Sequence, residues 1–300
     1  MPDFNAIIIG GSYAGLSAAM ALGRSRRRVL LLDTGRPCNR QTPHSHNFLT
    51  QDGATPAALR AQALAQTLQY PTVELRAEEA VTATAVAGCF EVGTATGASY
   101  TAPKLLLATG VIDLLPALPG FAECWGISVL HCPYCHGYEV GDQRLGVIGN
   151  GDMGFEFVRL IHNWSPRLTL FTDGPATLNP AQQQALVRHG IAVVETPLAG
   201  IAHTQGQLRA MQLADGTAHP LDAVFARVPF EQAGTLARQL GCAFTEMGHV
   251  QVDDMQRTGV PGLFAAGDAT TPFRAVSAAV AAGGKAGAIM NMELIAEKFQ

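Results

Sequence analysis

The residues best suited to chemistry in this 300-residue chain lie in the segment His131-Cys132-Pro-Tyr-Cys135-His136. Two residues between cysteines allow the thiols to close a disulfide, and a neighbouring imidazole or helix start can lower the pKa of a thiol. The spacing therefore predicts a redox-active pair. Two alternatives stay open: buried thiols that never react, and a zinc site that includes Cys124, although no second cysteine pair with ligand spacing follows.

A glycine-rich turn near the start of the chain has the residue types of a nucleotide site. Gly10, Gly11, Ser12 and Gly15 lie between a short apolar stretch, residues 5–10, and a helical stretch of small apolar residues. The next apolar stretch, residues 28–33, ends at Asp33, 18 residues after Gly15 (33 minus 15). Such a turn lets the backbone approach a pyrophosphate, and the acid can accept a hydrogen bond from a ribose hydroxyl. Ser12 replaces the middle glycine, but the strand, helix and terminal acid favour a nucleotide site over an ordinary turn.

The same pattern recurs in the middle of the chain. Gly149, Gly151 and Gly154 follow the apolar residues 145–148, and Asp173 lies 19 residues after Gly154 (173 minus 154). A 2′-phosphate of NADPH needs a basic residue near this acid, yet no Lys or Arg occurs from residue 172 until Arg188. The pattern predicts a possible second nucleotide site that either suits NADH or no longer binds a nicotinamide cofactor.

These motifs require parallel strands with helical crossovers. Two strand–helix–strand units imply parallel sheets. Residues 80–100 and 208–228 resemble small antiparallel meanders, residues 104–110 and 260–268 resemble further strands, and the last 50 residues return to a helical pattern. We expect an α/β protein of two Rossmann-like domains, each with three layers (ββα), with the second inserted in the first. The expected boundaries are residues 1–114 and 247–300 for the first domain and 115–246 for the second.

Composition limits the classes of function. Apolar residues make up 48% of the chain and charged residues 15%, with a net charge of −4, so the pattern indicates neither nucleic acid nor a membrane as a partner. We expect a cytoplasmic protein, since neither an export signal nor an apolar stretch long enough to span a membrane is apparent. Cys38, Cys89 and Cys242 are interpreted as small buried residues. His44 and His46 are either polar loop residues or part of a ligand pocket.

Taken together, these motifs resemble the low-molecular-weight thioredoxin reductase family from end to end. The resemblance implies FAD in the first domain and a discontinuous FAD-binding domain interrupted by a pyridine-nucleotide-like domain that carries the cysteines. It also implies that Asp33 meets the adenosine ribose and Asp268 the ribityl chain of FAD. The implied cofactor-binding residues are Gly10, Gly11, Ser12, Gly15, Asp33, Thr109, Gly110, Gly267, Asp268, Arg274 and Ala275. Ala275 stands where the family has glutamine, so that contact is expected through the backbone.

Within that family, the sequence of residues 132–139 is similar to that of a branch with the motif CxxCH. This branch includes dithiol oxidases of the gliotoxin and holomycin type and flavin disulfide reductases that do not use NADPH. The resemblance implies that Cys135 faces the flavin, Cys132 exchanges with substrate, and His136 is an acid or base. We expect an FAD-dependent thiol-disulfide oxidoreductase without a standard NADPH site and without a metal, with NAD(P)H use uncertain. Its expected partner is a thioredoxin-like protein or a small dithiol or disulfide, and homodimerisation is implied by the family.

Two other functions stay open: an NAD(P)H-dependent thioredoxin-disulfide reductase, and a flavin redox sensor without turnover. The end of the chain suggests one further hypothesis, in which Phe299 and Gln300 fold over the flavin and shield it from nicotinamide. A frayed helix end is the alternative interpretation.

Overall fold

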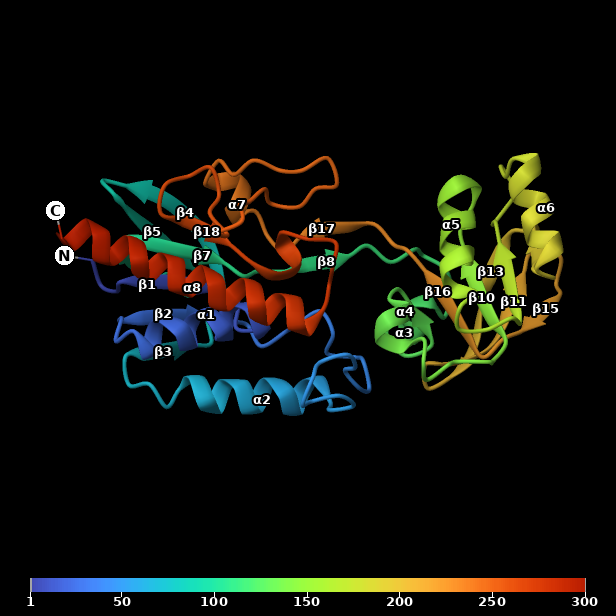
Figure 1. The fold of residues 1–300 in the computed structure, drawn as a ribbon, viewed down its shortest axis with the longest axis horizontal. Helices are drawn as coiled ribbons and strands as arrows, with labels where there is room; N and C mark the ends of the chain where they lie inside the picture. Colours follow the sequence, from blue (N-terminus) through green and yellow to red (C-terminus); the bar gives the residue numbers. More distant parts are fainter. Residues whose placement is uncertain (1, 300) are drawn as a thin grey trace. The chain divides into compact units, whose positions relative to one another are not determined.

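Two parallel five-stranded sheets organise the structure, a computed structural model that describes residues 2–299. Each belongs to one of two units (Figure 1). Unit 1 comprises residues 2–40, Asn47–Ile112 and residues 230–299, and unit 2 comprises Gln41–His46 and Asp113–Pro229. Among residues 2–299, the helices lack the combination of length and apolar sequence that a membrane span requires.

The sheet of unit 1 has β1 near its centre, in the order β18-β7-β1-β2-β3. Its strands are β18 (Leu263–Ala265), β7 (Lys104–Leu107), β1 (Ala6–Ile9), β2 (Val29–Leu32) and β3 (Val73–Arg76). Every residue of β1, β2, β7 and β18 is buried, as expected for a parallel sheet covered on both faces. The expected strands at residues 5–10, 28–33, 104–110 and 260–268 are thereby confirmed.

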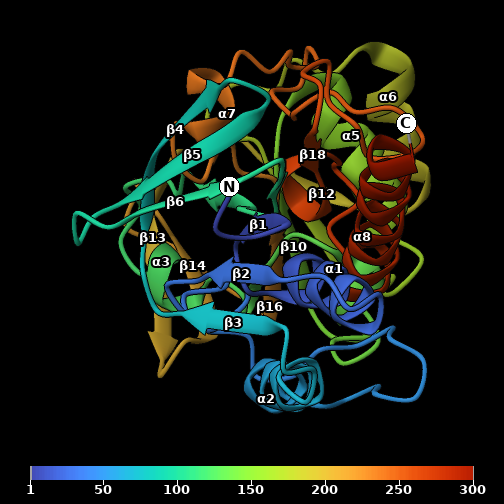
Figure 2. The same cartoon turned by 90° about the vertical axis from the view of Figure 1, so that its left-hand side faces the viewer.

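Both faces of this sheet are covered (Figure 2). The helices α1 (Tyr13–Arg24) and α8 (Val276–Phe299) lie on one face, and α2 (Pro56–Thr67) packs beside α1. An antiparallel sheet of β4 (Ala80–Val86), β5 (Cys89–Thr94) and β6 (Ser99–Ala102) covers the other face. The short helix α7 (Leu236–Gln239) packs against β4, and η1 (Gly267–Ala269) follows β18. Unit 1 therefore has the predicted three layers.

Helices α1 and α8 approach closely because glycines line their contact. A Cβ added to Gly283 would lie 2.0 Å from the backbone oxygen of Ala14, and one added to Gly287 would lie 2.7 Å from that of Ala18. Real Cβ atoms do not approach backbone oxygens so closely, so only glycine permits this packing. The contact holds the start of α1, where the first glycine-rich turn ends, against the first half of α8.

Unit 2 repeats the parallel design in the order β12-β11-β10-β16-β9. Its strands are β12 (Ala192–Val194), β11 (Leu168–Phe171), β10 (Leu145–Ile148), β16 (Ala223–Ala226) and β9 (Val129–Leu130). Helix α5 (Gly151–Ile161) connects β10 to β11, and α6 (Pro180–Arg188) connects β11 to β12. The second predicted strand–helix–strand unit is confirmed.

The second antiparallel meander differs from the expectation for residues 208–228. It consists of β13 (Leu198–Thr204), β14 (Gln207–Leu213) and β15 (Ala218–Pro220) and so begins ten residues earlier (208 minus 198). Residues 223–226 instead form β16, which pairs in parallel with β10. Ala223-Val-Phe-Ala226 is apolar throughout and completely buried, which suits the centre of a parallel sheet and not a half-exposed meander.

The boundary between the units also differs from the expectation. Residues 230–246 belong to unit 1, because Leu236, Leu240 and Cys242 are buried in the core beneath the β4–β6 sheet. The chain leaves and re-enters unit 1 through β8 (Val111–Asp113) and β17 (Phe230–Gln232), which pair as a two-stranded sheet. The short segment Gln41–His46 belongs to unit 2, which no pattern in the sequence indicated.

Candidate active site

The redox pair lies on a tight turn of unit 2. Cys132 and Cys135 form a disulfide with 5.3 Å between their Cα atoms. Cys132 is the N-cap of the one-turn helix α4 (Pro133–His136), and its carbonyl accepts hydrogen bonds from the backbone N–H groups of Cys135 and His136. Pro133 suits the first helical position because it has no N–H to satisfy. Both cysteines are partly exposed, so an external thiol can reach the pair.

The side chain of Trp164 packs against this turn. A Cβ added to Gly137 would lie 2.6 Å from Nε1 of Trp164 and 2.5 Å from the carbonyl oxygen of Pro133. The ring of Trp164 also meets Tyr134 edge to face, with 5.4 Å between centroids. This packing sets the position of α4 and therefore of Cys135.

His136 has the properties of a base beside the pair. Burial lowers the pKa of its imidazole, and the repulsion of His46 adds to this, while the nearby Glu139 carboxylate partly opposes the shift. The ring is therefore neutral at neutral pH and can accept a proton from a thiol. Among residues 2–299, no group of three or more His, Cys, Asp or Glu side chains is placed to hold a metal ion.

The first glycine-rich turn connects β1 to α1 and fits a pyrophosphate. Gly10 has a φ of +105°, and a Cβ there would lie 2.2 Å from the carbonyl oxygen of Ala108. A Cβ on Gly15 would lie 1.8 Å from the carbonyl oxygen of Gly10. Ser12 is the N-cap of α1, but within the described chain its side chain makes no capping hydrogen bond. A helix N-terminus without a side-chain cap, following a glycine-rich turn, is suited to bind an anion.

Asp33 at the end of β2 lies beside this turn and has a partner that sequence patterns missed. The Arg60 guanidinium on α2 donates to the Asp33 carboxylate and, over 3.2 Å, to the carbonyl oxygen of Gly11. A Cβ on Gly11 would lie 2.7 Å from the Asp33 side chain. Arg60 therefore ties together the turn, the acid and α2. No spacing rule identifies it, because the contact exists only after α2 has packed against α1.

The remaining residues predicted for the first site follow β7 and β18. These strands are adjacent and parallel, with Leu107 opposite Ala265, so residues after their carboxyl ends gather at one edge of the sheet. Asp268 lies there with the Sγ of Cys38 at 3.7 Å and Nε of Arg274 at 3.5 Å. The structure places the following predicted residues at this edge: Thr109, Gly110, Gly267, Asp268, Arg274 and Ala275. The donors, the acids and the glycine cradle fit a flavin dinucleotide.

The second glycine-rich turn connects β10 to α5 and differs in its helix start. Gly149 and Gly154 are in close contact, since a Cβ on Gly154 would lie 2.6 Å from the Gly149 carbonyl carbon. The Asn150 side chain accepts hydrogen bonds from the backbone N–H groups of Gly151 and Thr177, both at 2.8 Å. The same side chain donates to the carbonyl oxygens of residues 172 and 175. The chain itself thereby uses a donor that a pyrophosphate would need.

The side chain of Asp173 is also used in a hydrogen bond within unit 2. Its carboxylate accepts a hydrogen bond of 2.8 Å from the backbone N–H of Leu198, and its own backbone has a φ of +50°. The segment from residue 172 to 187 carries no basic side chain. The second turn therefore has the glycine spacing of a nucleotide site without the side chains that recognise a 2′-phosphate.

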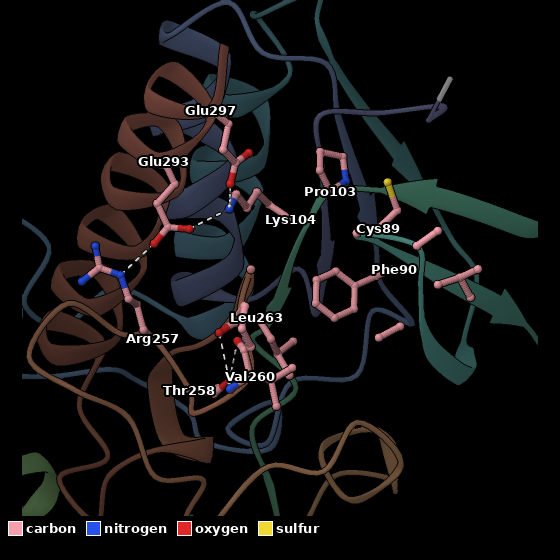
Figure 3. Close-up of a pocket in the computed structure, with 16 residues that line it drawn as sticks. Cys89, Phe90, Pro103, Lys104, Arg257, Thr258, Val260, Leu263, Glu293 and Glu297 are labelled. Carbon is pink, nitrogen blue, oxygen red and sulfur yellow. Dashed lines mark hydrogen bonds and ion pairs between the residues drawn. The ribbon is translucent and has the colours of Figure 1, made fainter. Parts of the chain in front are cut away.

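A separate pocket of about 500 Å³ lies at the opposite edge of the unit 1 sheet (Figure 3). The buried ammonium of Lys104, at the start of β7, lies 2.7 Å from Glu293 and 2.7 Å from Glu297, and Arg257 also pairs with Glu293. These charges neutralise one another. None of the residues predicted for a site lines this pocket.

Phe299 lies near that same edge, so the hypothesis of a flavin lid is not supported within one chain. Glu297, two residues earlier, is held by Lys104 at the start of β7, whereas Gly10 follows the end of the parallel strand β1. Phe299 is highly exposed. The other residue of that hypothesis, Gln300, lies outside the described residues.

Comparison with known proteins adds a family assignment to this geometry. Residues 4–283 match the family model described as pyridine nucleotide-disulphide oxidoreductase. The protein named thioredoxin reductase tcpT from Claviceps purpurea is 33% identical, with 98% of this chain and 95% of that protein covered. A crystal structure of an oxidoreductase from Agrobacterium tumefaciens is 38% identical with a TM-score of 0.91 and covers 97% of this chain and 98% of that one. TrxB from Bacillus anthracis is 30% identical with a TM-score of 0.94 and covers 98% and 99%.

Proposed function

The chain belongs to the pyridine nucleotide-disulphide oxidoreductase family and is an FAD-dependent disulfide oxidoreductase of the thioredoxin reductase type, and we propose that it exchanges electrons with a dithiol or disulfide without NADPH. The observation that carries this proposal is the second glycine-rich turn. Asn150 caps the helix start there, Asp173 accepts a hydrogen bond from Leu198, and residues 172–187 contain no basic side chain. A 2′-phosphate would meet a carboxylate where it needs a cation.

The chemistry of the cysteine pair follows from its placement. A thiolate of a dithiol substrate attacks Sγ of Cys132, the Cys132–Cys135 bond breaks, and its electron pair leaves on Cys135. His136 accepts the proton of the second substrate thiol. That thiolate attacks the substrate sulfur of the mixed disulfide and releases Cys132 as a thiolate. The substrate is oxidised to a disulfide by two electrons, and the cysteine pair is reduced by two.

Residues of unit 1 would hold the cofactor. Gly10, Gly11, Ser12 and Gly15 would bind the FAD pyrophosphate, and Asp33 would accept from the adenosine ribose. At the other strand ends the proposed contacts are Thr109, Gly110, Gly267, Asp268, Arg274 and Ala275. FAD, when bound, supplies the two-electron redox chemistry that returns the cysteine pair to the disulfide. In the reverse direction the same residues would reduce a disulfide substrate.

The substrate and assembly are part of the proposal. The partial exposure of both cysteines and the relatives named thioredoxin reductase support a thioredoxin-like protein or a small dithiol as the substrate. We further propose a homodimer, which rests on family resemblance, and a cytoplasmic location. A nucleotide at Gly149, Gly151, Gly154 and Asp173 is not required for this activity.

The test is anaerobic mixing of the flavin-loaded protein with NADPH, NADH or a dithiol while the visible flavin absorbance is followed. The proposal expects bleaching by the dithiol and none by NADPH. Recovery of the absorbance in air would make the reaction a dithiol oxidation by oxygen, and a lack of recovery would indicate another electron carrier. Rapid bleaching by NADPH would overturn the proposal in favour of an NADPH-dependent disulfide reductase.

A non-catalytic redox sensor is the second candidate, supported by the partial exposure of the disulfide. Cys132→Ser separates the two functions. If the protein is a sensor, neither the wild type nor the variant turns over a dithiol, and the variant keeps its flavin spectrum. If it is the proposed enzyme, the wild type turns over a dithiol and the variant does not.

A further inference from the structure

Arg60 on α2 connects the two parts of the first nucleotide site. Its guanidinium donates to Oδ2 of Asp33, at the end of β2, and its Nε donates over 3.2 Å to the carbonyl oxygen of Gly11 in the glycine-rich turn. The Arg60 side chain is 25% exposed and that of Asp33 12% exposed, so salt screens this pair less than a surface pair. A guanidinium presents its N–H groups in a rigid plane, and one side chain can therefore hold both acceptors in a fixed relation.

The packing of α2 fixes where this guanidinium lies. Arg60, Ala63, Leu64 and Thr67 have the spacing i, i+3, i+4, i+7 and so share one face of the helix. Thr67 is fully buried, with its Oγ1 3.4 Å from the carbonyl oxygen of Leu16 on α1. Ala63 and Leu64 pack against the core to which α1 contributes. The helix face that carries Arg60 is therefore held against α1.

The contact with Arg60 leaves one carboxylate oxygen of Asp33 for a ligand. Arg60 binds Oδ2, and among the described residues Oδ1 has no hydrogen-bond partner. A Cβ added to Gly11 would lie 2.7 Å from the Asp33 side chain, so the turn and the acid are already in contact. A nucleotide must place its pyrophosphate on the turn and its ribose on the acid at the same time. An acid that is held in position before binding makes this less costly in entropy.

Charge gives a second reason for a cation at this place. The Asp33 carboxylate lies beside the turn proposed to bind a pyrophosphate, which carries negative charges of its own. Like charges so close together repel each other. The Arg60 guanidinium offsets the charge of Asp33 while leaving Oδ1 able to accept a hydrogen bond.

We propose that Arg60 is a positioning residue for the adenosine half of FAD, orienting Asp33 toward the ribose hydroxyl and holding it beside the pyrophosphate turn. The inference rests on the cofactor contacts proposed for Gly11 and Asp33. It does not depend on the electron donor or on the dithiol substrate. Arg60 acts through Asp33 and is assigned no bond to the cofactor.

The first test compares FAD with two analogues that lack the 2′- or the 3′-hydroxyl of the adenosine ribose. Each is titrated into the deflavinated full-length chain while the flavin fluorescence is followed. The wild type should prefer FAD to at least one analogue. Arg60→Gln should weaken FAD binding about 10-fold or more, because hydrogen bonds to a charged group are lost, and should bind FAD and that analogue almost equally. If all three ligands weaken by the same factor, Arg60 acts on the pyrophosphate or on the fold alone, and the inference is overturned.

The second test is a double-mutant cycle on the dissociation constant of FAD. Asp33→Asn should weaken binding at least as much as Arg60→Gln. The double variant should bind FAD about as weakly as Asp33→Asn alone, within about threefold, because residues that act through one another are not additive. Effects that multiply in the double variant would show that Arg60 does not act through Asp33 and would overturn the inference.

The matched control is Arg144→Gln in unit 2. Arg144 also donates two hydrogen bonds to an aspartate, Asp222, so this variant loses a similar ion pair and should leave FAD binding unchanged. A weakening equal to that of Arg60→Gln would show a general effect of lost ion pairs and overturn the inference.

Arg60→Lys separates position from charge and guards against misfolding. Lysine keeps the charge but lacks the planar fork that reaches both acceptors. The variant should keep the urea unfolding midpoint of the flavin-free protein and recover only part of the lost FAD affinity. Full recovery would overturn the positioning role. These measurements use no electron donor, so they can fail or succeed independently of whether NADPH bleaches the flavin.

Discussion

The disulfide of Cys132 and Cys135 is the residue pair on which the proposed activity depends. Because thiol exchange needs both sulfurs, Cys135→Ser should lower dithiol turnover by about two orders of magnitude or more. Cys132 then keeps a free thiol without its partner sulfur, so when it attacks a disulfide substrate and displaces one substrate sulfur as a thiolate, it should accumulate as a mixed disulfide. Turnover and intact-protein mass spectrometry would measure both effects.

The control for this prediction is Cys89→Ser. Cys89 is a free, partly exposed cysteine on β5 of unit 1, and its replacement should leave turnover unchanged. If Cys135→Ser retained turnover within a few-fold of the wild type, the cysteine pair could not be the redox centre.

A charged pair in unit 2 gives a prediction on acid stability. The Arg144 side chain donates to both carboxylate oxygens of Asp222, and this bonding lowers the pKa of Asp222 to about 2. The stabilisation is present above the unfolded value of 3.8 and is lost as the pH falls toward 2. Both side chains are at least a third exposed, so Asp222→Asn should cost only about 0.5–1 kcal/mol at pH 7.

Urea unfolding of the wild type and Asp222→Asn at pH 7 and pH 3 would check this prediction. About half of the difference should be gone at pH 3, because the unfolded-state carboxyl, with its pKa of 3.8, is mostly protonated there while the folded-state carboxyl is still mostly ionised. Arg144→Gln should give a similar loss at pH 7, and the double variant should add little. An unchanged difference at both pH values would contradict the role of the ion pair.

At the scale of elements, the packing of α1 against α8 should affect both the stability of the protein and the glycine-rich turn proposed to bind FAD. Gly283→Ala should destabilise the protein by about 2–4 kcal/mol, because the new Cβ meets the Ala14 backbone, which cannot move as a side chain can. The flavin content of the purified protein should fall as well, since the displaced helix begins at the glycine-rich turn. Denaturant unfolding and the ratio of flavin to protein absorbance would measure these effects.

Gly284 provides the matched control on the same helix. A Cβ there would lie 3.1 Å from the flexible Ser17 hydroxyl, and alanine gains up to about 1 kcal/mol of helix propensity. Gly284→Ala should therefore be close to neutral in stability and in flavin content. Equal destabilisation by the two substitutions would show that the close approach to Ala14 does not limit the packing.

Elements with strong local patterns were predictable from the sequence. The strands β1, β2, β10 and β11 are short, mostly apolar segments. A glycine-rich turn and a helix separate β1 from β2, and the same arrangement separates β10 from β11. Local hydrophobicity and turn chemistry decide such units. The second meander was placed wrongly because β16 has an apolar sequence that fits either sheet, and only pairing with β10 selects one.

At the scale of the whole molecule, the flavin should stabilise unit 1 alone. Removal of FAD should raise backbone hydrogen exchange at the β1–α1 turn, at the end of β2 and at η1, because the ligand binds the folded form of these segments. Residues 149–154 of unit 2 should be unaffected. Hydrogen exchange measured by mass spectrometry on the flavin-loaded and flavin-free proteins would test this.

Adding back FAD provides the internal control, since it should restore protection only at the segments of unit 1. Loss of protection in residues 149–154 on flavin removal would contradict the assignment of the cofactor to the first turn. Protection of the same residues by added NADPH would instead show that the second turn is occupied.

The fold class, the two glycine-rich turns and the cysteine pair could be recognised from the sequence, because each depends on residues close together in the chain. The sequence also indicated that the second turn lacks a basic partner. Tertiary structure alone decided the partners of these motifs: Arg60 on Asp33, Asn150 on the loop after β11, and His46 on Glu139. These contacts join segments separated by many residues, and they form only when packing of the core brings the segments together. Pattern and spacing carry no information about such distances.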